Sequence, residues 1–300
     1  EEQEAFRDAA RDFAHDVMMP RAREWDENSI FPVEQLRAAA SLGFGGIYVK
    51  EDVGGSALSR LDAAIIFEEL AQGCVSTAAY ISIHNMAAWM IDTFGSVDVR
   101  HRFLPKLCTM EHFASYCLTE PGAGSDAASL RTTAKREGDH YVLNGEKIFI
   151  TNGGVADTYV VFAVTTPGVG THGISAFIVE KGWKGFDFGD HYDKLGIRSS
   201  STAELMFNDV KVPKENLLGK EGQGFKIAMA TLDGGRIGIA SQALGIAQGA
   251  FEAAVDYAKE RVQFGKPIAF QQAISFKIAD MATKLRTARF LVYSAAELKQ

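Results

Sequence analysis

The amino-acid sequence predicts an α+β protein built in three successive parts: helical, then β, then helical. Apolar residues recur with helical spacing up to about residue 111 and again after about residue 224. Between these points they alternate with a period of two, and glycine, proline and aspartate separate the runs. We therefore expect an N-terminal α-helical domain at 1–111, a middle β domain at 112–224 and a C-terminal α-helical domain at 225–300.

In the first part, Phe6, Phe13 and Val17 lie on one helical face, and residues 61–70 repeat this pattern. The glycine-rich stretches 41–46 and 52–55 are typical of the turns that end helices. This part is therefore predicted to be all-α.

In the middle part, residues 141–150 form two alternating runs with Asn-Gly between them, which predicts a β-hairpin. Further strands are expected at 158–164, 174–179 and 203–210, so a mostly antiparallel barrel or sandwich is the simplest arrangement. Residues 168–173 match the pattern GxGxxG, but a strand-like run follows instead of a helix. We expect a hairpin loop there, not a dinucleotide site.

In the last part, two long helices are expected at about 225–263 and 270–300, separated by glycine and proline at 264–267. The second helix carries an apolar seam suited to a helical bundle. The seam consists of Ile274, Ile278, Met281, Leu285, Ala288 and Val292. Because the chain stops within this helix, we expect the natural domain to continue past Gln300.

The composition excludes several classes of protein. A chain of 300 residues with 47% hydrophobic residues can bury a large core, and its net charge of -7 with scattered Lys and Arg argues against a nucleic-acid partner. Cys74, Cys108 and Cys117 form no CxxC pair, which argues against a disulfide framework or a structural zinc site and favours a reducing compartment. Neither a membrane span nor a signal peptide is visible, so we expect a soluble intracellular protein.

Residues 116–126 join a short apolar strand to a loop rich in main-chain donors. Pro121 fixes one φ, and Gly122 and Gly124 allow the main chain to approach a ligand closely. The loop suits a phosphorylated, flat-ringed cofactor, although a turn without a ligand would use the same residues. A second segment, 147–154, ends a strand with Phe149, a threonine and a glycine turn, which could stack on a cofactor ring; ordinary core is the alternative for Phe149.

Two polar segments in the last part suggest a ligand with amide and phosphate groups. Asp233 and Arg236, at the expected start of the long helix, could hold an amide-rich arm or orient a carboxylate; a capping aspartate beside a solvated arginine is the alternative. Arg261 could bind phosphate or simply meet solvent. The histidines show no metal or nucleophile pattern, and His84 is expected in the core or in a pocket wall.

Together these segments resemble the acyl-CoA dehydrogenase family, whose three-domain α-β-α order agrees with this chain, and the likeness is greatest to isobutyryl-CoA and short-chain (butyryl) dehydrogenases. The resemblance implies FAD as cofactor, with Arg261 reaching the FAD diphosphate of a neighbouring subunit; at Phe149 relatives more often carry tryptophan. The implied FAD contacts are Tyr116, Cys117, Leu118, Thr119, Glu120, Pro121, Gly122, Ala123, Gly124, Ser125, Phe149, Ile150, Thr151, Arg261, Phe264, Gln271 and Gln272. The implied contacts to the CoA substrate are Ser125, Asp233, Gly234, Gly235 and Arg236.

The resemblance also implies the reaction and its setting. The family removes the α-proton of an acyl-CoA and transfers the β-hydride to flavin, giving a trans-2-enoyl-CoA and passing electrons to an electron-transferring flavoprotein. An acyl-CoA oxidase using O2 and a non-catalytic flavin- or CoA-binding assembly protein are the alternatives. The acyl chain is expected to be short, straight or branched. Met86, Trp89 and Met90 could limit its length, and an ordinary core role is the alternative for all three. A homotetramer is implied, in the cytoplasm of a bacterium or the mitochondrial matrix of a eukaryote, in fatty acid or branched-chain amino acid metabolism.

The family's base is a desolvated glutamate with a raised pKa. A minority of relatives carry it within the segment 232–237, but the equivalent residue here is Gly235, and nothing gives Glu120 a catalytic role. We therefore assign no catalytic residue within the chain and expect the glutamate beyond Gln300. The 300-residue chain is accordingly expected to be incapable of efficient α-proton abstraction.

Overall fold

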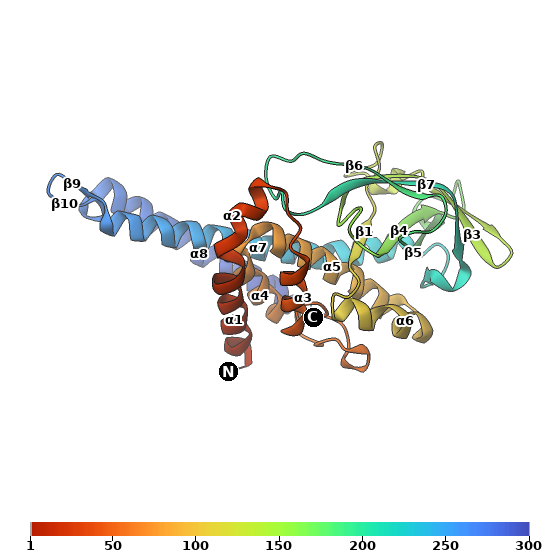
Figure 1. Ribbon diagram of the computed structural model, residues 1–300, viewed down its shortest axis with the longest axis horizontal. Helices are drawn as coiled ribbons and strands as arrows, with labels where there is room; N and C mark the ends of the chain where they lie inside the picture. Colours follow the sequence, from red (N-terminus) through yellow and green to blue (C-terminus); the bar gives the residue numbers. More distant parts are fainter. Residues whose placement is uncertain (1, 300) are drawn as a thin grey trace. The chain divides into compact units, whose positions relative to one another are not determined.

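The computed structural model describes residues 2–299 and groups them into two compact units (Figure 1). Unit 1 comprises 2–22, 59–78 and 236–299 of the described residues, and unit 2 comprises 23–58 and 79–235. Glu1 and Gln300, the outer limits of the predicted domains and of the predicted last helix, lie outside the described residues. The predicted boundaries near 111 and 224 stay a prediction.

The first helices of unit 1 are α1 (Glu2–Phe13), a π-helical turn (Ala14–Met18) and α4 (Arg60–Gly73). The turn leads into α2 (Met19–Glu27), whose residues 23–27 belong to unit 2. Ser59 and Asp62 cap α4 reciprocally, each accepting a main-chain N–H of the other. Gly73 allows α4 to approach the π-helical turn, because a Cβ there would lie 2.4 Å from the Ala14 carbonyl oxygen. The predicted helical character of this part is confirmed.

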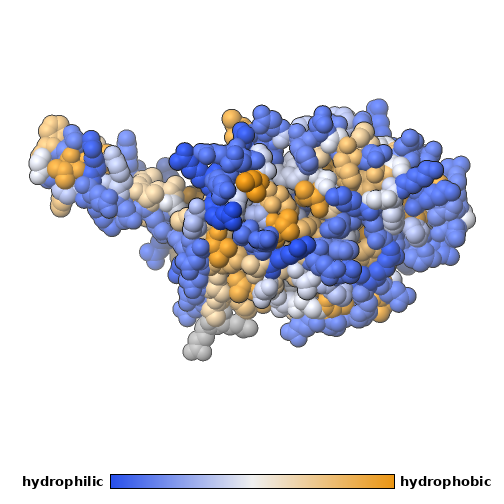
Figure 2. All heavy atoms as spheres, in the orientation of Figure 1, coloured by the Kyte–Doolittle hydropathy of each residue, from blue (hydrophilic) through white to orange (hydrophobic). Residues whose placement is uncertain are grey.

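The other helices of unit 1 are α8 (Gln272–Leu298) and the part of α7 (Gly224–Glu260) that follows Gly235. The short strands β9 (Val262–Gln263) and β10 (Lys266–Pro267) join them, as the predicted break requires. The predicted seam of α8 faces α7 across an apolar groove of about 550 Å³ that includes Leu244, Phe251, Met281 and Leu285. Figure 2 shows hydrophobic residues gathered at the tip that β9 and β10 form.

Unit 2 contains α3 (Val33–Ser41), most of α5 (Val75–Phe94) and α6 (Val97–Cys108). His84 of α5 is fully buried; its Nε2 donates to the Leu107 carbonyl oxygen at 2.9 Å, and its Nδ1 accepts from the Ala114 N–H at 3.0 Å. Burial lowers the pKa of His84 to about 4, so the ring is neutral and ties α6 to the first strand. The expected core position of His84 is confirmed.

The sheet of unit 2 runs in the order β6-β7-β3-β2-β4-β5-β8, with β1 paired to β4 (Figure 1). Most pairs are antiparallel, as predicted, and the parallel pairs are β1 with β4 and β2 with β4. The strands are β1 (Ala114–Cys117), β2 (Thr133–Glu137), β3 (His140–Thr151), β4 (Thr158–Val164), β5 (Ile174–Glu180), β6 (Phe186–His191), β7 (Thr202–Pro213) and β8 (Leu217–Leu218). Residues 168–173 connect antiparallel β4 and β5, which confirms the hairpin-loop interpretation.

The hairpin predicted within 141–150 is wrong, because these residues lie on the single long strand β3. Its Asn-Gly pair forms an irregularity instead of a turn: the Asn144 amide exchanges two hydrogen bonds with Asp209 of β7, at 3.0 and 2.9 Å. Gly145 has a φ of +145° and lies directly against Thr132. The chain reverses earlier, at Gly138, where Glu137 of β2 pairs with His140 of β3.

The structure of residues 2–299 also describes the cysteines, the potential metal ligands and the apolarity of the helices. All three cysteines are buried with free thiols. Among the described residues, no group of His, Cys, Asp and Glu is arranged to hold a metal ion, and no helix combines the length and apolarity needed to cross a membrane.

Candidate functional site

The two segments predicted to contact a cofactor lie side by side in unit 2. At the β1 end, the Ser115 hydroxyl donates to the Thr151 carbonyl oxygen at 2.6 Å. Further along, the Ile148 N–H donates to the Thr119 carbonyl oxygen at 2.9 Å. The loop that follows β1 is therefore fixed against the carboxyl-terminal half of β3.

The loop begins with a tight turn whose ends are buried and whose tip is exposed. Glu120 and Ala123 exchange two main-chain hydrogen bonds, both 3.1 Å long, and both side chains are buried. Pro121 and Gly122 occupy the tip, where proline at the second turn position is favourable. The turn therefore presents main chain, not bulky side chains, to its surroundings.

The glycines of this turn are not explained by internal packing. A Cβ on Gly122 or Gly124 would meet nothing within 4 Å, and neither residue has a positive φ. By contrast, Gly153 at the end of β3 would place a Cβ 2.8 Å from the Ile150 carbonyl oxygen, so packing accounts for it. The open space over Gly122 and Gly124 fits a ligand that lies directly on the main chain.

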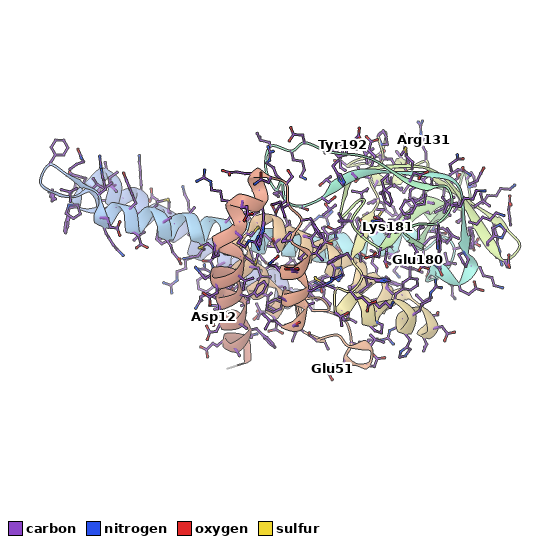
Figure 3. The ribbon with its side chains drawn as sticks, viewed as in Figure 1. Asp12, Glu51, Arg131, Glu180, Lys181 and Tyr192 are labelled. Carbon is purple, nitrogen blue, oxygen red and sulfur yellow. The ribbon has the colours of Figure 1, made fainter. Side chains whose placement is uncertain are left out.

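A buried ion pair, which sequence reasoning missed, lies beneath the turn. Lys147 Nζ is 2.6 Å from Glu120 Oε1 and donates to the Leu118 carbonyl oxygen at 3.1 Å; the lysine side chain is 0% exposed and the glutamate side chain 6%. The Glu120 carboxylate also accepts the N–H groups of Arg131 at 2.6 Å and Thr132 at 3.0 Å; Figure 3 labels Arg131. The sequence signal for Lys147 is only a lone cation directly before the apolar run Ile-Phe-Ile.

Each member of this pair changes the pKa of the other, and Glu120 is ionised at neutral pH. Burial raises the pKa of Glu120, but the Lys147 charge and the hydrogen bonds outweigh burial and leave that pKa below its ordinary value of 4.5. Burial lowers the pKa of Lys147, while Glu120 opposes this shift. With its oxygens occupied and its pKa low, Glu120 is unsuited to be a general base.

Phe149 has a strained main-chain conformation and an exposed side chain. Its φ is +55°, which is unfavourable for an aromatic residue, and its side chain is 60% exposed. The pairing of β3 with β7 shifts register between Lys147 and Ile150, which brackets the strained residue. The Phe149 ring lies 4.9 Å from the ring of Tyr192, whose hydroxyl donates to Glu204 at 2.7 Å (Figure 3 labels Tyr192). An exposed strained aromatic on a supported ring is a candidate for ligand stacking; the alternative of ordinary core for Phe149 is wrong.

The other residues of the two segments divide into buried and exposed sets. The side chains of Cys117, Leu118 and Ile150 are buried, so they can offer a ligand only main-chain atoms. Burial also raises the pKa of the Cys117 thiol to about 12, which makes it unreactive. Tyr116 packs against Phe162 at 5.3 Å. The predicted flavin contacts in these two segments that are at least partly exposed are Tyr116, Thr119, Pro121, Gly122, Gly124, Ser125, Phe149 and Thr151.

The predicted position of Asp233 to Arg236 at the start of the long helix is wrong. Helix α7 begins at Gly224, so Asp233 lies in its third turn and is not a capping residue. Glycine is tolerated there because the helix packs closely: a Cβ on Gly235 would lie 2.9 Å from both Sδ and Cε of Met86. Asp233 is exposed, and Gly234 is buried.

The remaining predicted contacts belong to unit 1, around the turn that joins α7 and α8. Arg261 directly follows α7, and its carbonyl oxygen accepts the Ile268 N–H at 2.8 Å. Phe264 is 94% exposed with φ +53°. Gln271 and Gln272 stand at the start of α8. These four residues form a second candidate segment that is separate in sequence from the loop of unit 2.

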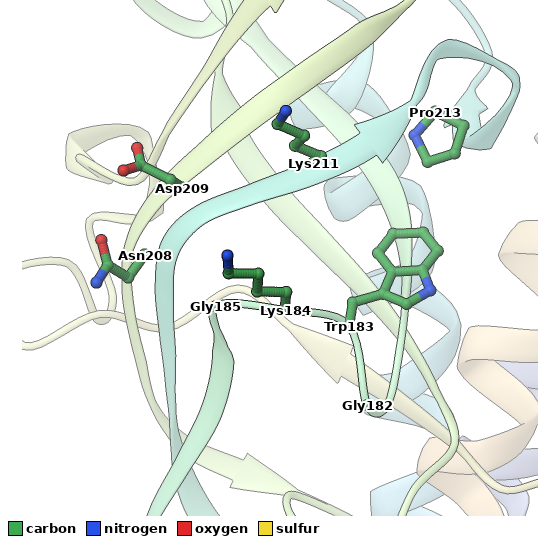
Figure 4. A pocket seen from close by; sticks show the side chains of 8 residues that line it. All are labelled: Gly182, Trp183, Lys184, Gly185, Asn208, Asp209, Lys211 and Pro213. Atoms are coloured by element: carbon green, nitrogen blue, oxygen red, sulfur yellow. The ribbon is translucent and has the colours of Figure 1, made fainter.

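A hollow of about 890 Å³ at the end of the sheet contains none of the predicted site residues. Figure 4 shows Lys184 and Lys211 pointing into it, with Trp183 beside Lys184. Its remaining lining residues are Gly182, Gly185, Asn208, Asp209 and Pro213. None of its polar side chains is buried, which distinguishes it from the turn anchored by Glu120.

Comparison with known proteins identifies the family. Family models for the acyl-CoA dehydrogenase N-terminal, middle and C-terminal domains match residues 1–111, 115–210 and 222–300. The chain is 55% identical over 300 residues to a mitochondrial isobutyryl-CoA dehydrogenase of Bos taurus, covering 100% of this chain and 72% of that protein.

Two solved structures are also similar. Butyryl-CoA dehydrogenase from Megasphaera elsdenii has a TM-score of 0.96 and 48% identity, with coverage of 99% of this chain and 79% of that one. A structure described as "Electron transferring flavoprotein of Acidaminococcus fermentans: Towards a mechanism of flavin-based electron bifurcation" has a TM-score of 0.97 and 50% identity, with coverage of 100% and 79%. The chain belongs to the acyl-CoA dehydrogenase family.

Proposed function

We propose that this protein is an FAD-dependent acyl-CoA dehydrogenase that converts a short acyl-CoA to the trans-2-enoyl-CoA and passes electrons to an electron-transferring flavoprotein. The single observation that carries the proposal is the open main-chain edge at Gly122 and Gly124 beside the exposed, strained Phe149. Similarity to isobutyryl-CoA and butyryl-CoA dehydrogenases supports the short acyl chain. A bound flavin would supply the acceptor for the two electrons that leave the substrate.

In this proposal different residues of the chain bind the flavin and the thioester ligand. Main-chain groups from Thr119 to Ser125 hold the flavin, and Phe149 covers its ring. Ser125 and the segment Asp233 to Arg236 bind the thioester ligand. Donors at the thioester carbonyl would stabilise the enolate that forms as the α-proton leaves.

We assign the α-proton base to none of the carboxylates near this turn. Glu120 is committed to Lys147 and to two main-chain amides, and Gly235 has no side chain. The residues named above are thus proposed for binding alone, and proton removal requires a further group.

Substrate reduction of the flavin tests the proposal. The purified natural protein, with its flavin bound, is mixed anaerobically with isobutyryl-CoA or butyryl-CoA, and absorbance near the flavin maximum is followed. We expect bleaching, with the larger rate identifying a branched or straight acyl chain. No bleaching with either thioester would contradict the proposal and favour a binding protein.

Reoxidation then identifies the electron acceptor. We expect the reduced protein to recover its flavin absorbance quickly on adding an electron-transferring flavoprotein and slowly in air. Rapid recovery in air alone would indicate an acyl-CoA oxidase.

We further propose a homotetramer, because Arg261 and Phe264 are exposed in a single chain and would complete the flavin site of a neighbouring subunit. A bacterial source would place the protein in the cytoplasm and a eukaryotic source in the mitochondrial matrix. Light scattering of the flavin-bound protein measures the assembly, and a monomer with full flavin occupancy would contradict the role of Arg261.

A further inference from the structure

The ion pair between Glu120 and Lys147 connects the three pieces of main chain that surround the proposed flavin site. Glu120 is one end of the tight turn, and its carboxylate accepts the N–H groups of Arg131 and Thr132 at the far end of the loop. Lys147 lies on β3 and also donates to the Leu118 carbonyl oxygen at the start of the loop. The two side chains therefore close the loop from its first residue to its last.

Lys147 also fixes the segment that carries Phe149. It is the last residue of β3 in register with β7 before the irregularity, pairing with Leu205, and regular pairing resumes at Ile150 with Ala203. Phe149, with its positive φ, lies inside this interval. A lysine that is fixed at one end of the interval limits how far the strained segment can relax.

Because Glu120 and Lys147 are buried, a protein that keeps only one of the two charges should lose folding free energy. Removing one partner of a buried ion pair leaves an uncompensated charge, whereas removing both is often tolerated. Simple fold stability could be achieved with apolar side chains at both positions, so the pair has a more specific use. That use is suggested by what it joins: an open glycine edge and an exposed aromatic, neither of which is explained by internal packing.

We propose that Glu120 and Lys147 are positioning residues for the flavin: their buried ion pair holds the glycine turn and Phe149 in the arrangement that binds FAD. This inference rests on the proposed function and extends it. It makes the affinity for FAD depend on two residues whose buried side chains do not contact FAD. It requires that FAD affinity fall when the pair is broken, beyond any general loss of stability.

The test measures FAD affinity and thermal stability in the same set of proteins. The wild-type natural protein, E120Q, K147M and E120Q/K147M are stripped of flavin; the FAD Kd is measured from flavin fluorescence and the Tm from circular dichroism. D92N is the control, because the buried Asp92 pairs with Arg100 at 2.7 Å and neither residue belongs to the turn or to the segment of Phe149.

We expect E120Q and K147M to weaken FAD binding by at least about tenfold. D92N should lower Tm while its FAD Kd stays within about threefold of the wild-type value. The double variant buries no unpaired charge, so it should fold and regain part of the Tm lost in K147M, yet remain at least about tenfold weaker for FAD.

Two outcomes would overturn the inference alone: wild-type affinity in the double variant, or an FAD Kd that follows Tm across all variants, including D92N. Failure of the wild-type protein to bind FAD would overturn the proposed function and this inference with it.

Discussion

Phe149 and Phe264 are two exposed phenylalanines with nearly the same unfavourable main-chain conformation, φ +55° and +53°, but with very different support. Phe149 packs against Tyr192 and follows a lysine that is held by a buried carboxylate. Phe264 occupies the tip of the two-residue connection between β9 and β10, where Gln263 pairs with Lys266. Within residues 2–299, no aromatic ring lies against Phe264.

The difference shows two ways of presenting an aromatic side chain. At Phe149 the surrounding side chains impose the strained conformation through interactions with residues distant in sequence. At Phe264 the connection itself imposes it, because a type I′ hairpin turn has positive φ at both central residues, and Gly265 supplies the second at +73°. The first site should therefore be sensitive to changes far along the chain, and the second only to changes within the turn.

The largest effect is expected when the support of Phe149 is removed. Lys147→Met leaves the buried Glu120 carboxylate without its cation and should lower the free energy of unfolding by about 3–5 kcal/mol at neutral pH. Urea denaturation measures this loss. Lys181→Met is a suitable control, because Lys181 is exposed: its ammonium donates to the Gly154 carbonyl oxygen and lies 5.9 Å from the centre of the Phe188 ring, and the change should cost less than about 1 kcal/mol. Equal losses in the two variants would show that the pair does not support this region.

Lowering the pH should reduce the difference in unfolding free energy between the wild-type protein and K147M. The pKa of Glu120 is lowered in the folded protein, so the stability it contributes is complete above its ordinary value of 4.5 and is lost as pH falls below it. In K147M the unpaired buried carboxylate has a raised pKa, so this variant gains stability as pH falls from 7 toward 4.5 and the uncompensated charge disappears. Unfolding free energies measured from pH 7 to pH 4 should therefore converge, and a constant difference would contradict the assignment of the charge to Glu120.

A smaller effect on stability, a gain at Phe264 and none at Phe149, is expected from asparagine. Phe264→Asn places a residue that tolerates positive φ in an exposed turn and should raise stability by about 1 kcal/mol. Phe149→Asn relieves similar strain but loses the contact with Tyr192, so it should give no gain. Differential scanning calorimetry compares them, with Phe264→Ala separating loss of the ring from relief of strain. A gain at both sites would contradict the claim that Phe149 is held by its neighbours.

The same contrast between local and distant interactions explains what the sequence could predict. The period of two located β4 at residues 158–164, since that pattern is local. The Asn-Gly pair of β3 misled because its conformation depends on Asp209, 65 residues away. Lys147 was missed because a lysine is ordinarily exposed, and only Glu120, 27 residues earlier in the chain, allows it to be buried. The sequence singled out the glycines of the loop as predicted ligand contacts, but whether their surroundings were open could not be read from it.

Substitution of the loop glycines should have the smallest effect on stability, and it can be compared directly with substitution in the turn at Phe264. Gly122→Ala adds a methyl group that meets nothing within 4 Å at a residue without positive φ, so unfolding free energy should change by less than about 0.5 kcal/mol. Gly265→Ala also meets no neighbour, but its φ of +73° should cost about 1 kcal/mol.

FAD titration of the flavin-free proteins then separates folding from binding. Gly122→Ala should weaken FAD by at least about tenfold despite its unchanged stability, because the methyl group occupies the space where the ligand meets the main chain. Wild-type affinity in a stable Gly122→Ala protein would mean that the cofactor does not lie on this turn.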